Sequence, residues 1–162
     1  MYIIFSIVLM LLLVAFTVFY GPPYVPTLNQ QKNAALDLLD LKPGQTMLEL
    51  GSGDGRVLLA AAQQGLNAVG IELSPMLAFI SWYRTRKYRK QVRIICGNYF
   101  RVQWPPAEGI FTFMIGHQMA KLDTRIEQWR AGTSVRLASN TFTIPNKKPV
   151  KEKNGVFLYE YK

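Results

Sequence analysis

Three glycines separated by single residues lie in the segment Glu49–Arg56, which reads Glu-Leu-Gly-Ser-Gly-Asp-Gly-Arg. The residues before the glycines, 46–50, have the apolar character of a short buried strand, and residues 57–64 are rich in Ala and Leu, as a helix would be. Glycines between a strand and a helix let the backbone turn sharply and come close to a bound ligand. This segment is therefore the first candidate for a ligand site.

Glu72 lies about 20 residues beyond the glycine turn, at the end of a second apolar strand predicted over 68–71. An acidic side chain in that place can accept hydrogen bonds from both hydroxyl groups of a ribose. Arg56 occupies a place where the dinucleotide-binding pattern requires a small residue, and no Gly-Lys-Ser/Thr sequence forms a phosphate-binding loop. Together with Glu49, these features favour an adenosine-type ligand over a plain strand-to-helix turn.

Beyond residue 27 the apolar periodicity alternates between helix and strand. Helices are predicted over 28–41, 57–64, 75–90 and 119–129, and strands over 46–50, 68–71, 92–96, 110–115, 134–142 and 155–161. Elements that alternate at this spacing imply right-handed crossovers. We therefore predict an α/β fold with a doubly wound, mostly parallel sheet.

The first 20 residues are almost entirely apolar or aromatic, and no charged residue occurs before Lys32. A helix of about 19 residues rises roughly 28 Å, close to the hydrocarbon thickness of a bilayer. A secretory signal peptide would need a positive n-region and a small-residue cleavage site, and neither is visible. We expect a transmembrane anchor over 1–20, a Pro-rich connector over 21–27 and a domain over 28–162. The domain is expected on the cytoplasmic side, because the nearest basic residues follow the anchor.

The composition narrows the class of protein. The 162 residues include 19 Lys and Arg against 10 Asp and Glu, with one Cys and one His. A single Cys excludes an internal disulfide and a Cys-rich zinc module, and plentiful aliphatic and aromatic residues exclude intrinsic disorder. The formal charge of +9 indicates an anionic partner, which can be nucleic acid, an anionic membrane surface or an acidic substrate.

The segment Glu49–Arg56 resembles motif I of class I S-adenosylmethionine-dependent methyltransferases, and Gly70–Pro75 resembles the motif that follows it. More narrowly, Pro23–Thr27, the glycine turn and Trp82–Arg84 resemble the membrane-anchored protein-lysine methyltransferases of the ATP synthase c-subunit and adenine nucleotide translocase type. The resemblance covers about residues 21–136. It implies a minimal Rossmann-like methyltransferase domain with S-adenosyl-L-methionine as its cofactor.

The resemblance also implies a set of cofactor-binding residues: Glu49, Gly51, Ser52, Gly53, Asp54, Gly55, Arg56, Glu72, Leu73, Asn98 and Tyr99. Within this set, Glu49 and Asp54 would hold the methionine ammonium group directly or through water, and Glu72 would bind the ribose. Asn98 stands where these enzymes often carry an acidic residue near the adenine amino group. Its amide oxygen can still accept a hydrogen bond.

On the acceptor side, the implied catalytic residues are Tyr24, Pro26, Thr27 and His117. The segment 24–27 would fold over the methyl-bearing sulfonium and help to form a lysine channel. His117 stands where the family pattern has a proline, and it could accept the lysine proton because its side chain titrates near neutral pH. A structural, hydrogen-bonded histidine is the alternative. The region after Phe142 is short for the antiparallel hairpin that usually closes this sheet.

Residues 82–90 interleave cations with aromatic rings. Such a composition occurs on RNA-binding faces, but on a helix it is equally that of a solvated basic side. With an anchor expected, anionic lipid is the favoured partner rather than nucleic acid, each cation contributing about 1 kcal/mol. The basic segment 147–153 is expected to be an exposed loop.

The predicted function is methylation of a lysine side chain on a membrane or membrane-adjacent protein, without a metal ion. Two alternatives stay open. One is a methyltransferase for a lipophilic small molecule such as a quinone. The other is a non-catalytic protein that binds the cofactor and contacts lipid or RNA.

Overall fold

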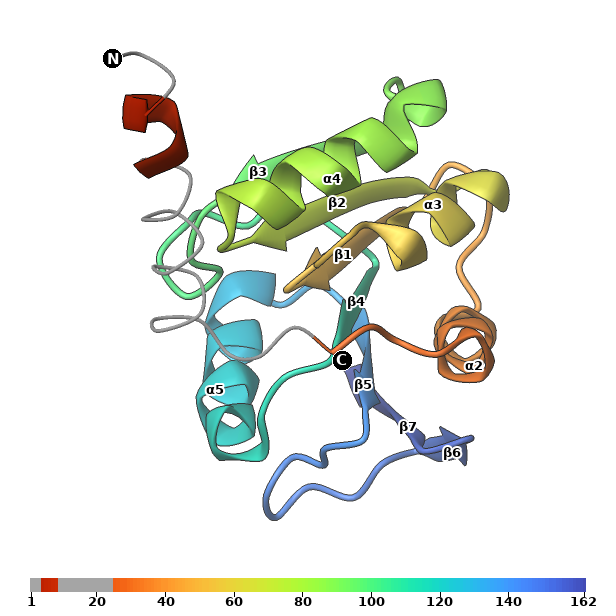
Figure 1. The fold of residues 1–162 in the computed structure, drawn as a ribbon. Helices are drawn as coiled ribbons and strands as arrows, with labels where there is room; N and C mark the ends of the chain where they lie inside the picture. Colours follow the sequence, from red (N-terminus) through yellow and green to blue (C-terminus); the bar gives the residue numbers. More distant parts are fainter. Residues whose placement is uncertain (1–3, 9–24) are drawn as a thin grey trace.

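The computed structural model describes residues 4–8 and 25–162 of the chain (Figure 1). Residues 4–8 form a short helix. Across the two described ranges, no helix has the length and apolar character needed to cross a bilayer.

This finding corrects two predictions, the single N-terminal transmembrane helix and the single-pass localisation with a cytoplasmic domain. The remainder of the range expected as the anchor, 1–3 and 9–20, lies outside the described residues, as do residues 21–24 of the connector. The domain boundaries remain predictions.

The centre of the fold is a seven-stranded sheet with the order β3-β2-β1-β4-β5-β7-β6. Its strands are β1 (Thr46–Leu50), β2 (Asn67–Glu72), β3 (Val92–Cys96), β4 (Gly109–Thr112), β5 (Val135–Asn140), β6 (Lys151–Lys153) and β7 (Val156–Tyr161). The first five strands are parallel, whereas β7 runs antiparallel to both β5 and β6. The predicted mostly parallel α/β sheet is confirmed.

Helices cover both faces of this sheet. They are α2 (Asn29–Leu39), α3 (Arg56–Gln63), α4 (Pro75–Thr85) and α5 (Met119–Arg130), with single 3₁₀ turns η1 (Arg86–Tyr88) and η2 (Gly116–Gln118). Neighbouring strand residues point to opposite faces, so Met47 packs in the core cluster with α2 and α3, whereas Leu48 packs in the cluster with α5. Figure 1 shows α5 on the opposite side of the sheet from α2.

The region after Phe142 was expected to be short for an antiparallel hairpin that closes the sheet. The structure has this hairpin, formed by β6 and β7. The basic segment expected as a loop contains β6, which pairs with β7 through a two-residue turn of Asn154 and Gly155. Both turn residues have positive φ, 52° and 73°, as the tight hairpin turn that suits twisted strands requires. An Asn-Gly pair is the strongest short-range hairpin signal, so this element could have been predicted.

The turn between β1 and α3 is in close contact with α4, which yields a first prediction. A Cβ at Gly55 would overlap the Oγ of Ser81 and lie 3.0 Å from its Cα, and Gly55 also has a φ of +76°. We expect Gly55→Ala to lower the free energy of unfolding, measured by denaturant titration, by about 2–4 kcal/mol.

Gly132→Ala is the matched control, because Gly132 has a φ of +85° but no atom within 4 Å of the place that a Cβ would take. It should lose about 1 kcal/mol through backbone strain alone. If both variants lose the same free energy of unfolding, the contact with Ser81 does not contribute to the cost of a side chain at position 55.

Candidate cofactor and active site

The glycine turn lies where two parallel strands end side by side. Leu50 and Ile71 are register partners at the carboxyl ends of β1 and β2. The amides of Gly51 and Ser52 both donate to the Ile71 carbonyl oxygen, at 2.9 and 3.1 Å. The chain leaving β1 therefore crosses over the end of β2, and ligands of such sheets bind at this edge.

Glu72 holds the glycine turn in place. Its Oε2 accepts a hydrogen bond from the Gly53 amide at 2.8 Å, and its Oε1 accepts one from the Ser74 amide at 2.8 Å. The carboxylate is buried, and charge-assisted bonds of this kind are stronger than those between neutral groups. Glu72 thus connects the end of β2 to the turn after β1, and its predicted contact with ribose remains a prediction.

Glu49 is the most deeply buried acid of the site, with 3% of the residue exposed. Its Oε2 is buried and has no hydrogen-bond partner among the described residues. Burial raises the pKa of Glu49 well above its ordinary value of 4.5, and the negative charges of Asp54 and Glu72 raise this pKa further. A cation beside Glu49 would reverse this effect, so the carboxyl fits the ammonium group that the family resemblance implies for it.

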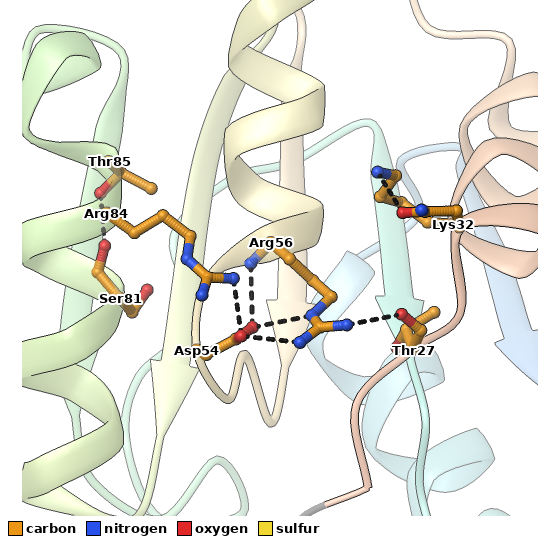
Figure 2. Close-up of polar contacts among 8 residues, drawn as sticks. Thr27, Lys32, Asp54, Arg56, Ser81, Arg84 and Thr85 are labelled. Atoms are coloured by element: carbon orange, nitrogen blue, oxygen red, sulfur yellow. Dashed lines mark hydrogen bonds and ion pairs between the residues drawn. The ribbon is translucent and has the colours of Figure 1, made fainter.

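Asp54 is held between two guanidinium groups (Figure 2). Arg84 of α4 lies 2.6 Å from Oδ2, and Arg56 at the start of α3 contacts both carboxylate oxygens, with its Nη2 2.9 Å from Oδ2 and its Nε 3.1 Å from Oδ1. The Asp54 side chain is 10% exposed. These contacts join α3 to α4 and leave the predicted ammonium contact of Asp54 as a prediction.

Arg56 also reaches the segment expected to cover the cofactor. Its Nη1 donates to the Thr27 carbonyl oxygen at 3.3 Å, as Figure 2 shows. Thr27 is buried and Pro26 is exposed. Tyr24 lies outside the described residues. The structure therefore places the end of the predicted cover segment against the glycine turn through Arg56.

The loop after β3 carries the residues predicted for adenine. Asn98 Oδ1 accepts a hydrogen bond from the Phe100 amide at 2.8 Å, so the loop itself uses the oxygen assigned to the ligand. The Tyr99 hydroxyl donates to Gln118 Oε1 at 2.7 Å. Burial and the charge of Glu72 raise the pKa of Tyr99 to about 12. Leu73 is exposed at the same edge.

His117 is exposed in η2, directly after the region of β4. Its neighbour Gln118 is the residue that turns toward Tyr99. Thus η2 contributes to the same end of the sheet as the glycine turn, and the part of His117 in proton transfer remains a prediction.

Comparison with known proteins identifies the family. Residues 49–151 match the sequence model of the ANTKMT methyltransferase domain. The chain belongs to this family. Among curated relatives, the ATP synthase c-subunit lysine N-methyltransferase of Xenopus laevis is 32% identical over 129 residues, 76% of this chain and 55% of that protein. Adenine nucleotide translocase lysine N-methyltransferase of Mus musculus is 32% identical over 133 residues, 79% of this chain and 56% of that protein.

The chain thus spans about half the length of these curated relatives. Among solved structures, an RNA methyltransferase from Salinibacter ruber in complex with S-adenosyl-L-homocysteine has a TM-score of 0.75. It is 24% identical, and the match covers 85% of this chain and 92% of that one. This likeness confirms the class I methyltransferase fold of the ANTKMT-type domain.

Two contacts of this ANTKMT-type domain were not predicted from sequence. Arg84 was interpreted as part of a basic surface, and Ser81 was not singled out, yet both face the glycine turn. Their spacing of three residues places them on one side of α4. That side also buries Ala78 and Thr85, a pattern of small residues that could have indicated a close helix contact.

The buried Glu49 predicts a pH dependence of stability. Because the pKa of Glu49 is raised in the folded protein, the folded state binds its proton more tightly than the unfolded state does. Stability should therefore fall as the pH rises above about 4.5, by up to about 1.4 kcal/mol per pH unit until Glu49 ionises. Denaturant titrations across this range should show that Glu49→Gln lacks this component. The exposed Glu152→Gln should retain it, and identical pH profiles of Glu49→Gln and wild type would contradict the assignment.

The ion pair between Asp54 of the glycine turn and Arg84 of α4 predicts a second effect on stability. Replacing Arg84 by Gln removes one of the two guanidinium groups that contact the largely buried Asp54. We expect Arg84→Gln to lower the free energy of unfolding by about 1 kcal/mol, a modest value because the arginine itself is partly exposed. Arg89→Gln, an exposed cation beyond η1, is the control and should change it by less than about 0.5 kcal/mol. A loss no larger than that of the control would show that Arg84 does not stabilise the turn.

Proposed function

We propose that this protein transfers a methyl group from S-adenosyl-L-methionine to a lysine side chain of a membrane-associated protein. The observation that carries the proposal is the buried Glu49 carboxyl, whose Oε2 has no hydrogen-bond partner among the described residues. A buried acid of this kind is stabilised by a cation. The methionine part of the cofactor carries an ammonium group, and membership of the ANTKMT family supports the same assignment.

The rest of the turn would accommodate the remaining parts of the cofactor. Glu72 has already accepted one backbone hydrogen bond on each oxygen, but a carboxylate oxygen can accept a second from a ribose hydroxyl. At Gly51 no atom lies within 4 Å of the place of a Cβ, so the backbone there faces open space. Structures similar in fold, from Salinibacter ruber and Thiobacillus denitrificans, contain S-adenosyl-L-homocysteine, which supports this placement.

When bound, the cofactor supplies a methyl group that is already activated by a positively charged sulfur. What the chain must do is orient the lysine nitrogen toward that methyl group and exclude water. The lysine, whose ordinary pKa is about 10.4, must first lose a proton, and burial beside a positive charge favours this loss. We assign to the segment 24–27 the role of covering the reacting methyl group and excluding water. We assign to His117 the role of accepting the lysine proton.

The acceptor is proposed from the names of the relatives. Those proteins are named for lysine methylation of the ATP synthase c-subunit and of the adenine nucleotide translocase. Because this chain spans about half of their length, a membrane-associated protein with an accessible lysine is the substrate class that we propose. Contact with anionic lipid through the basic segment 82–90 is a further prediction.

Methyl transfer can be measured directly. The protein is incubated with methyl-labelled S-adenosyl-L-methionine and membranes, which are then separated into protein and lipid. We expect the label on lysine residues of the protein fraction, identified by mass spectrometry. Glu72→Ala should weaken cofactor binding, measured by calorimetry, about tenfold or more, because a bond to a charged group is worth about 1.5–3 kcal/mol.

The exposed Glu152→Ala serves as the matched control and should bind like the wild type. Absence of cofactor binding by the wild type would overturn the proposal. Label in the lipid fraction alone would assign the acceptor to a lipophilic small molecule. Cofactor binding without transfer to either fraction would assign a non-catalytic role.

A further inference from the structure

The outward surface of α4 is apolar along its length. Met76 is 50% exposed, Phe79 64%, Trp82 56% and Tyr83 55%, and Ile80 is also exposed. Four of these side chains follow the spacing i, i+3, i+4 and i+7, which places them on one side of a helix, and Trp82 stacks against Phe79 with ring centroids 5.8 Å apart. We call these five residues the α4 face.

This arrangement is the reverse of that in an ordinary surface helix. The side of α4 that faces the protein buries Ala78, Ser81 and Thr85, which are small or polar. The large apolar side chains point outward instead. Burying one such side chain is worth about 1.5–3 kcal/mol, so the fold alone gives no reason for this distribution. A contiguous exposed apolar surface of this kind marks an interaction site.

The stretch of sequence that contains the α4 face carries only positive charges. Between Leu73 and Ala107 the sequence has no Asp or Glu and has seven cations, namely Arg84, Arg86, Lys87, Arg89, Lys90, Arg93 and Arg101. Four of them, at 86, 87, 89 and 90, are exposed just beyond the C-terminal end of α4. The partner of this surface is therefore both apolar and anionic.

The aromatic rings distinguish lipid from nucleic acid. Bases bind single aromatic faces by stacking, but Phe79 and Trp82 stack on each other, and the Arg86 guanidinium lies 4.1 Å from the Tyr83 ring centroid. Met76 and Ile80 have no aromatic ring on which a base could stack. Insertion into a lipid interface requires only exposed apolar area, which Trp and Tyr supply well, with cations beside it for the headgroups.

We propose that the α4 face binds an anionic lipid bilayer, with its apolar side chains among the upper acyl chains and the cations at 86–90 among the headgroups. Each cation near such a surface contributes about 1 kcal/mol. The α4 face begins a few residues beyond Glu72, whereas the cations at 86–90 lie toward the opposite edge of the sheet, where the Gln91 carbonyl accepts a hydrogen bond from the Ala68 amide at the start of β2. The binding itself does not depend on methyl transfer.

The test uses Trp82 as a local probe in the full chain. Vesicles of phosphatidylcholine with about one third phosphatidylserine, carrying brominated acyl chains, quench tryptophan that enters the bilayer. The signal of Trp82 is the difference between wild type and Trp82→Phe, which cancels any contact made by other parts of the chain. We expect Trp82 emission to shift to the blue and to be quenched.

Two triple variants separate the role of charge. Replacing Arg86, Lys87 and Lys90 by Gln removes about 3 kcal/mol of attraction, a reduction of about a hundredfold in the binding constant, and should abolish the quenching. The control replaces Lys148, Lys151 and Lys162, which are exposed elsewhere, and should leave the quenching unchanged. The same Trp82→Phe subtraction is applied in both.

Three results would overturn the proposal. One is unchanged Trp82 emission with the anionic vesicles, and another is equal quenching by vesicles of phosphatidylcholine alone. The third is quenching by single-stranded polyuridylate, or by an acidic protein, in the absence of any quenching by vesicles. Because the readout is fluorescence, it stays informative whether or not the protein transfers methyl groups.

Discussion

The carboxylate of Glu72 determines the shape of the candidate site, because it fixes the glycine turn of one strand to the end of the next. By accepting hydrogen bonds from the amides of Gly53 and Ser74, it satisfies two backbone donors that no regular element would pair. The same anchoring fixes the start of α3, and therefore where Asp54 and Arg56 lie. The contacts of Asp54 and Arg56 with Arg84 and Thr27 depend on this placement.

Three acidic residues, Glu49, Asp54 and Glu72, lie at the glycine turn, and they differ in how many hydrogen-bond or ion-pair partners they have. Glu72 is satisfied by backbone amides and Asp54 by two arginines, whereas the Glu49 oxygen is left without a partner among the described residues. Removing water from such a group without compensation is costly. A cation beside Glu49 would favour the ionised form that burial disfavours, and this is why a cationic ligand group fits the turn better than a neutral or anionic one.

Sequence patterns predicted the strands and helices of the sheet because their apolar periodicity is local. The ion pair between Asp54 and Arg84 could not be predicted in that way, since it depends on how closely α3 and α4 approach each other. The hairpin was missed although Asn154 and Gly155 signal it locally. The transmembrane helix was wrong, because no helix among the described residues is long and apolar enough to cross a bilayer. Tyr24 lies outside the described residues, and the remaining site roles stay predictions.

The hairpin at the end of the chain also has a consequence for solubility. An edge strand exposes unpaired backbone groups that can capture a strand of another molecule and start aggregation. Here the outermost strand is three residues long, and its sequence, Lys-Glu-Lys, is fully charged and exposed. A strand of a second molecule could form only a few backbone hydrogen bonds with this short edge. Its side chains would also lie beside the charged side chains of β6. The β6 edge thus ends the sheet in a way that discourages its growth from one molecule into the next.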